Sequence, residues 1–139
     1  MIANKYYQGN TREICHGIKE MDIDCMNTMI EFILNNKFIK KGDILIPAPQ
    51  HQGYAIYTKY IAEEIAKETG AIVKDVVKSK PREMLYKNRN INLNFYTTEI
   101  LNTQNTIFFV DNVISTGKTL NETSKLFGRY LEPLVYGII

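Results

Sequence analysis

The sequence predicts an α/β domain in which a mostly parallel, doubly wound sheet carries a small N-terminal lid. Short apolar runs typical of buried parallel strands alternate along the chain with segments that have helical spacing of apolar residues. Such alternation indicates strands joined by right-handed helical crossovers. With 139 residues the chain fits one domain, for which we expect a lid over residues 1–40 and a core over 42–139.

The elements are predicted from apolar spacing and from glycine stops. Helical spacing predicts helices over residues 21–39, 57–70 and 118–131. Apolar runs predict strands at residues 44–49, 71–77, 106–111 and 134–139. Residues 1–20 have no strong pattern and are assigned to the lid. Residues 78–105 are polar and weakly periodic, and a loop of that length inside a compact domain is usually functional.

Composition and charge narrow the range of partners. Hydrophobic residues make up 45% and charged residues 23% of the chain, as in an ordinary globular domain. A net charge of +2 gives no general attraction to nucleic acid or to anionic membranes, so neither is an expected partner. Cys15 and Cys25 make no disulfide framework, and no signal peptide is recognised, which favours a cytoplasmic location. The oligomeric state stays open, with a homodimer as one option.

The expected strand order places a ligand site at one edge of the sheet. In open parallel sheets, ligands bind beyond the carboxyl ends of the strands, at the point where the strand order reverses. If the order is 71–77, 44–49, 106–111, 134–139, that point lies between the second and third strands of this series. The loops that follow these two strands, PAPQHQG and DNVISTGKT, are the unusual loops of the sequence.

The segment DNVISTGKT, residues 111–119, predicts an anion site beside an acid. A tight turn that opens a helix presents unpaired backbone N–H groups and the positive end of the helix dipole, which suit a phosphate. Gly117 lets a ligand approach the backbone, and the neighbouring hydroxyls add donors. Asp111 would repel a phosphate, so we expect it to bind hydroxyls or Mg²⁺. The combination indicates a ribose 5-phosphate.

The segment also has two other interpretations. Asp111 and Ser115 are residue types that also cap helices without any ligand. The letters GKT also end a nucleotide-triphosphate P-loop, but the first glycine of that motif would fall at Asn112, and a P-loop has no acid at position 111. The ribose-phosphate interpretation explains both the acid and the loop.

The stretch FFVDNVISTGKTL resembles the signature of type I phosphoribosyltransferases, which is a hydrophobic strand, two acids, two apolar residues and a Thr/Ser-Thr-Gly-x-Thr loop. It matches at every position but one. Outside the signature, GDILIPAP and the helix IAEEIAKETG resemble the ComF-like branch, and KNRNINLNF is loosely similar to its Arg- and Asn-containing stretch. The resemblance covers residues 42–139 and implies a fold of the type I phosphoribosyltransferase kind.

The resemblance implies that the substrate is phosphoribosyl pyrophosphate with Mg²⁺. A nitrogenous base would displace pyrophosphate, which is a glycosyltransferase reaction of nucleotide metabolism. Asp111 and Asn112 would be the catalytic pair, with Asp111 on ribose hydroxyls and touching the metal only through the substrate. The 5-phosphate loop would be Ser115, Thr116, Gly117, Lys118 and Thr119. The pyrophosphate loop would be Ala48, Pro49, Gln50 and His51.

The basic segment 78–89 would be the mobile loop that closes over the site and excludes water. Arg82, Lys87 and Arg89 are its candidate pyrophosphate ligands, and the alternative for each is a solvated loop charge. His51 is a candidate to bind pyrophosphate or to transfer a proton, with a purely structural role as its alternative.

Two departures from the family pattern bear on activity. Asn112 stands where the family has a second acid, so it keeps hydrogen-bonding capacity but lacks a charge that would stabilise a developing cation. On that basis Asn112→Asp is expected to raise turnover. Ser115 stands where the 6-oxopurine branch has an Asp, which argues against hypoxanthine or guanine as the acceptor.

Two function hypotheses remain from the sequence. The first is an active phosphoribosyltransferase, which the intact STGKT loop and the basic segment favour. The second is a binding module that keeps the phosphoribosyl pocket without turnover and acts as a regulator or ComF-like accessory protein, which Asn112 favours. The acceptor base is set by the lid, where no motif identifies it.

Overall fold

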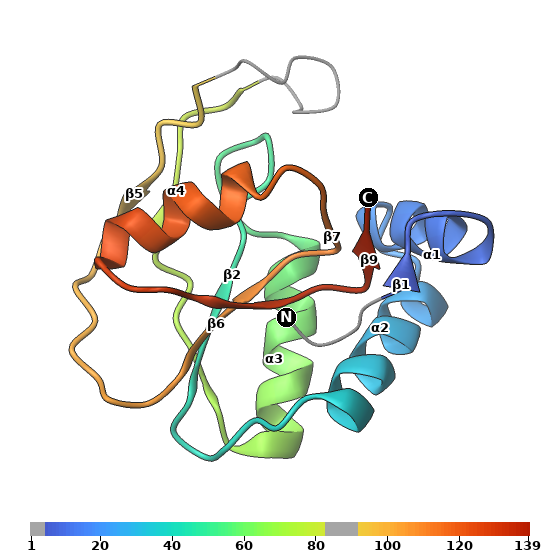
Figure 1. Ribbon diagram of the computed structural model, residues 1–139, viewed down its shortest axis with the longest axis horizontal. Coiled ribbons are helices and arrows are strands. Elements are labelled where there is room, and N and C mark those ends of the chain that lie inside the picture. Colours follow the sequence, from blue (N-terminus) through green and yellow to red (C-terminus); the bar gives the residue numbers. More distant parts are fainter. Residues whose placement is uncertain (1–4, 83–91) are drawn as a thin grey trace.

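The computed structural model describes residues 5–82 and 92–139 and is built around a four-stranded parallel sheet (Figure 1). Its strand order is β3 (Ile72–Val73), β2 (Ile44–Pro47), β6 (Ile107–Val110), β8 (Glu132–Leu134). Every residue of β2 and β6 is buried, as in a parallel sheet covered on both faces. The predicted α/β class is confirmed. The strands β3, β2 and β6 lie in the expected order, and the fourth position belongs to β8, which shares only Leu134 with the strand expected over residues 134–139.

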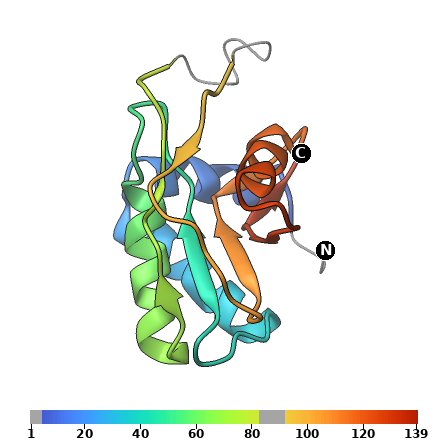
Figure 2. The same cartoon turned by 90° about the vertical axis from the view of Figure 1, so that its left-hand side faces the viewer.

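Helices cover the two faces of this sheet (Figure 2). Residues Leu45 and Phe108 point to one face and pack with α2 (Ile23–Asn36) and α3 (Tyr57–Thr69). Their neighbours Ile46 and Phe109 point to the other face and pack with α4 (Lys118–Phe127). Because side chains alternate along a strand, each short strand supplies both hydrophobic cores. The sheet is therefore doubly wound, as predicted.

The N-terminal residues are more regular than the sequence indicated. They form β1 (Lys5–Tyr6), α1 (Asn10–Lys19) and α2, which begins behind Asp22, whose carboxylate accepts from Cys25 N at 3.1 Å. α1 packs closely on α2 at Gly17, where a Cβ atom would collide with Cys25 Sγ. Cys15 and Ile18 of α1 belong to the same core as α2 and α3. Residues of the expected lid thus share a core with the sheet.

The chain's last segment corrects one prediction. The strand expected over residues 134–139 is divided between β8 and β9 (Gly137–Ile138). β9 lies in a second sheet, between β1 and β7 (Val113–Ile114). The division has a physical cause, because Tyr136 N and Gly137 N both donate to Asn112 O, at 3.0 and 3.1 Å, and turn the chain away from β6.

Two further boundaries differ from the predicted ones. The strand expected over residues 71–77 is β3 followed, after a break, by β4 (Val77–Lys78), which pairs antiparallel with β5 (Tyr96–Thr97). The helix expected to reach residue 131 ends at Phe127, because Gly128 adopts a left-handed conformation with φ 64°. Among the helices of the described ranges, none is both long and apolar enough to cross a membrane.

Candidate functional site

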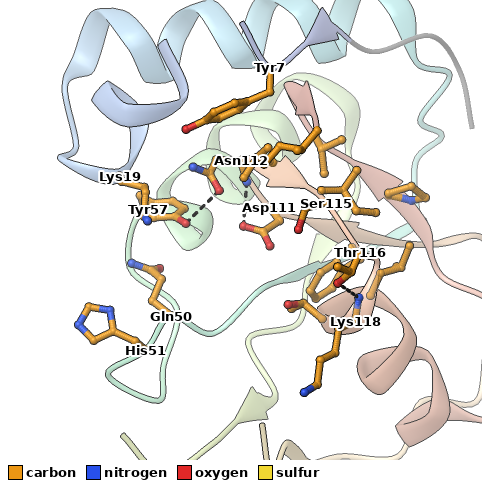
Figure 3. Close-up of a pocket in the computed structure, with 18 of the residues that line it drawn as sticks. Tyr7, Lys19, Gln50, His51, Tyr57, Asp111, Asn112, Ser115, Thr116 and Lys118 are labelled. Atoms are coloured by element: carbon orange, nitrogen blue, oxygen red, sulfur yellow. Dashed lines mark hydrogen bonds between the residues drawn. The ribbon is translucent and has the colours of Figure 1, made fainter. Parts of the chain in front are cut away.

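A cleft of about 810 Å³ opens at the carboxyl ends of β2 and β6, the edge predicted for the ligand (Figure 3). One wall is the loop of residues 49–52 after β2, and the facing wall is the segment 111–119 that ends in α4. A third wall comes from the N-terminal region, through Tyr7 and α1. The two loops singled out in the sequence therefore lie across one cavity from each other.

Residues 115–117 join β7 to α4 on this cavity, and Lys118 and Thr119 begin the helix. Gly117 adopts φ 80° and ψ 7°, a left-handed conformation that favours glycine, directly before the first helical residue. Ser115 and Thr116 are exposed, and Thr116 Oγ1 accepts from Lys118 N at 3.3 Å. The first turn of α4 lines the cleft, so its N–H groups and the positive end of the helix dipole lie at the cleft.

Asp111 lies at the floor of the cleft, where β6 ends. Its Oδ1 accepts from Asn112 N at 2.8 Å, and its backbone N donates to Leu134 O at 3.1 Å. Burial raises the pKa of the Asp111 carboxyl to about 6, against the opposing effects of the Asn112 N–H, Lys19, Arg82 and the Tyr57 hydroxyl. The group is therefore ionised above about pH 6 and neutral in mild acid, so the cleft floor changes charge in that range.

The side chain of Asn112 is buried and makes two hydrogen bonds within the protein. Its Oδ1 accepts from Tyr57 OH at 3.2 Å, and its Nδ2 donates to Cys15 O at 3.1 Å. The amide thus ties the end of β6 to both α3 and α1. The sequence suggested that this amide binds a ribose hydroxyl. The side chain is buried, so a ligand has little access to its second N–H or its second lone pair.

The loop after β2 is hydrogen-bonded to residues at the start of α3. Ala48 and Pro49 are buried, while Gln50 and His51 are half-buried and line the cleft. Gln50 Oε1 accepts from Ile56 N at 2.6 Å, and Thr58 Oγ1 donates to Ala48 O at 2.7 Å. These bonds fix the loop to the start of α3. The predicted pyrophosphate loop therefore has a defined shape, with the His51 side chain at the rim (Figure 3).

Arg82 lines the cleft but its guanidinium is directed at backbone carbonyls. It donates from Nη1 to Gln50 O at 2.6 Å and from Nη2 to Pro49 O at 3.2 Å. This contact brings the base of the predicted mobile segment onto the loop after β2. Lys87 and Arg89, the other two predicted pyrophosphate ligands, lie outside the described residues.

Several cleft residues were not expected from the sequence. Tyr7 OH and His16 Nε2 lie 2.7 Å apart on the N-terminal wall, and Lys19 and Glu20 follow on α1. Tyr57 of α3 lines the cleft as well, and neither His16 nor Tyr57 is expected from the sequence to have a role in it. Apolar residues at positions 14, 15 and 18 are a short helical pattern that could have revealed α1 and hence this wall.

The side chains around the cleft bear on whether it can hold a metal ion. Within residues 5–82 and 92–139, no group of three or more His, Cys, Asp or Glu side chains is arranged to hold a metal ion. Mg²⁺ commonly binds through one or two carboxylates together with substrate phosphates and waters. Asp111 at the cleft floor fits a metal that arrives with a phosphorylated ligand, which is the role implied by the resemblance.

Comparison with known proteins adds no further constraint on the site. No family model, no curated protein and no solved structure matches this chain.

Proposed function

We propose that this protein is a phosphoribosyltransferase, which binds phosphoribosyl pyrophosphate with Mg²⁺ in the cleft and transfers the ribosyl group to a nitrogenous base. The observation that carries the proposal is the juxtaposition of three features on one cavity. The STGKT loop at the N-terminus of α4 and Asp111 form one wall and the floor, and the loop of residues 49–52 forms the facing wall. The fold, of the type I phosphoribosyltransferase kind, is part of the same proposal.

Each wall has a chemistry that suits one part of this substrate. The loop 115–119 would bind the 5-phosphate through backbone N–H groups and hydroxyls. Asp111 would accept hydrogen bonds from the ribose hydroxyls. The loop of residues 49–52 would bind pyrophosphate. Mg²⁺, when bound, would neutralise phosphate charge and orient the leaving group.

In the reaction a new C–N bond forms at the anomeric carbon as the C–O bond to pyrophosphate breaks. The bonding electron pair leaves with pyrophosphate, and the base loses a proton. Positive charge develops on the sugar ring, and the ionised Asp111 carboxylate beneath it stabilises that charge. Because the Asp111 carboxyl has a pKa of about 6, this stabilisation is present at neutral pH and is lost in mild acid.

A second function has one observation in its favour. The Asn112 amide is occupied by Tyr57 and Cys15, which leaves Asp111 as the carboxylate at the end of β6. A pocket with a single carboxylate there suits a binding module that recognises a phosphoribosyl compound without turnover. Such a module would act as a regulator or a ComF-like accessory protein.

Two measurements on the wild-type protein separate these functions. Isothermal titration calorimetry with phosphoribosyl pyrophosphate and Mg²⁺ tests binding, which both functions require. Pyrophosphate release with a panel of purine, pyrimidine and pyridine bases tests turnover. Binding with base-dependent release supports the enzyme, and binding without release for any base supports the module. No binding by calorimetry contradicts both.

A further inference from the structure

The Arg82 side chain is engaged by several groups of the protein at the edge of the cleft. Besides the carbonyls of Pro49 and Gln50, its Nη1 contacts Ser79 Oγ at 3.0 Å, and its own backbone N donates to His51 O at 2.7 Å. The guanidinium carbon lies 5.0 Å from the centre of the Phe95 ring. One residue thus fixes three consecutive carbonyls of the loop after β2.

Fixing these carbonyls also fixes the N–H groups of the same peptides. In a trans peptide the C=O and the N–H point to opposite sides of the chain. The Gln50 and His51 carbonyls are held on Arg82, so the N–H groups of His51 and Gln52 point away from it. Both residues line the cleft. An anion on the side of the loop away from Arg82 would therefore meet both N–H groups.

The loop has a second attachment to the segment that carries Arg82. Ser79 N donates to Gly53 O at 2.9 Å. Gly53 has φ 106°, and a Cβ atom there would collide with the Ser79 carbonyl oxygen. The loop and residues 79–82 are consequently packed backbone to backbone, and Phe95 closes the other side of the guanidinium.

We infer that Arg82 is a positioning residue, which holds the loop of residues 49–52 in the shape that presents the His51 and Gln52 N–H groups to the pyrophosphate group of the substrate. The inference rests on the proposed function. It differs from the expectation that Arg82 is a direct pyrophosphate ligand on a closing loop, because its donors are directed at protein carbonyls.

Arg82 also acts on the cleft floor through its charge. It is one of the groups that lower the Asp111 pKa, together with the Asn112 N–H, Lys19 of α1 and the Tyr57 hydroxyl of α3. Burial opposes them and is the larger effect. Removal of the Arg82 charge therefore leaves the Asp111 carboxyl with a pKa above about 6. The Asp111 titration therefore reports the loss of the Arg82 charge separately from any change in the shape of the loop.

The test compares Arg82→Lys and Arg82→Gln with a matched control. Lysine keeps the charge but loses the planar fork that reaches two carbonyls, and glutamine loses the charge as well. Arg129 is the control, because its guanidinium also donates to two backbone carbonyls, Thr103 O at 2.8 Å and Asn105 O at 2.9 Å, away from the cleft. Arg129→Lys therefore shows how the loss of a guanidinium bonded to two carbonyls affects the fold when the cleft is not involved.

Calorimetry with two probes, inorganic pyrophosphate with Mg²⁺ and ribose 5-phosphate, gives the first readout. Arg82→Lys should weaken pyrophosphate binding by about tenfold or more, since a hydrogen bond from a charged donor is lost, and change ribose 5-phosphate binding less than about threefold. Arg129→Lys should change neither. If wild type binds neither probe, the proposed function fails. If wild type binds both and Arg82→Lys binds pyrophosphate within twofold of wild type, the Arg82 inference alone is overturned.

Nuclear magnetic resonance of the ligand-free variants gives the second readout. A positioning role predicts altered amide shifts for His51, Gln52 and Gly53 in Arg82→Lys without any ligand. Loss of the Arg82 charge predicts, in addition, that the Asp111 carboxyl has a higher pKa in Arg82→Gln than in Arg82→Lys. Unchanged loop shifts together with weakened pyrophosphate binding would overturn positioning in favour of direct ligation.

Discussion

The hydroxyl of Tyr57, on α3, donates a hydrogen bond of 3.2 Å to Oδ1 of Asn112, at the end of β6. Nδ2 of the same amide donates to Cys15 O on α1. Asparagine can make both bonds because it carries an acceptor and a donor on one planar group, whereas an ionised aspartate has acceptors only. The structure therefore gives a packing reason for asparagine at the position where the resembled family has an acid.

Asn112→Asp is accordingly expected to destabilise the fold. The substitution removes the donor to Cys15 O and buries a carboxylate oxygen against that carbonyl, close to Asp111. The expected loss is about 2–3 kcal/mol of unfolding free energy, measured by urea denaturation at pH 7.5. Tyr57→Phe, which removes one hydrogen bond and keeps the ring, is the control and should lose about 1 kcal/mol.

From the sequence alone, Asn112→Asp is expected to raise turnover, because the added charge would stabilise the developing cation. The two expectations are separable, because stability and pyrophosphate release are measured independently. A variant as stable as wild type and faster in turnover would contradict the packing account and support the electrostatic one.

Asp111→Asn is expected to stabilise the protein while weakening ligand binding. The folded pKa of Asp111 is raised from 3.8 to about 6, so the folded state binds more protons than the unfolded state between these values. Stability is therefore highest below the unfolded pKa and falls as the pH rises through about 6. Ionisation of Asp111 therefore lowers the unfolding free energy at neutral pH by at most about 3 kcal/mol.

Urea denaturation at pH 4, 5, 6 and 8 measures this effect. Wild type should lose stability along this series, and the loss should be smaller in Asp111→Asn, whose amide can still accept from Asn112 N through its oxygen. Ribose 5-phosphate binding should fall in the same variant. Parallel stability profiles for the two proteins would show that Asp111 is not the group responsible.

Lys37→Met is expected to stabilise the fold without touching the cleft. The Lys37 side chain is buried, its Nζ has no hydrogen-bond partner among the described residues, and burial lowers its pKa although Glu132 acts to raise it. Methionine keeps the length of the chain and removes the buried charge. The expected gain is about 1 kcal/mol, seen as a rise of a few degrees in Tm.

Lys40→Met serves as the control for this gain, because Lys40 is exposed and undergoes the same change of charge. It should leave Tm within about one degree of wild type. A lower Tm for Lys37→Met than for the control would mean that the Lys37–Glu132 attraction outweighs the burial of the ammonium group.

Much of the fold could be predicted because the signals were local. The apolar runs at residues 44–49 and 106–111 are long enough to identify buried strands, and the spacing within residues 57–70 identifies α3. Parallel pairing then brings the two strand ends, and the loops after them, to one edge. That rule alone locates the cleft.

The remaining features depend on partners that are distant in sequence. The break after β8 arises from hydrogen bonds to Asn112 O, more than twenty residues earlier. Similarly, the sequence shows Arg82 only as a charge in a polar segment, whereas the structure shows that it donates to the carbonyls of Pro49 and Gln50. α1 has only a short apolar pattern, and its close approach to α2 depends on Gly17 meeting Cys25. These contacts cannot be predicted from local sequence patterns.

The central claim is that the loop before α4 binds a ribose phosphate, and one pair of variants tests it most directly. Gly117 and Gly128 flank α4, and both are left-handed, with φ 80° and 64°. An added Cβ meets no close contact at either, its nearest neighbour at Gly117 being Asn121 Nδ2 at 3.8 Å. Gly117→Ala and Gly128→Ala should therefore cost similar stability, about 1 kcal/mol each.

Only Gly117 lies on the cleft. Calorimetry of ribose 5-phosphate binding at pH 7.5 should show affinity reduced about tenfold or more in Gly117→Ala, because strain at this residue displaces the first-turn N–H groups of α4. Gly128→Ala should bind like wild type. Equal affinities in Gly117→Ala, Gly128→Ala and wild type, or no binding by wild type, would contradict the account.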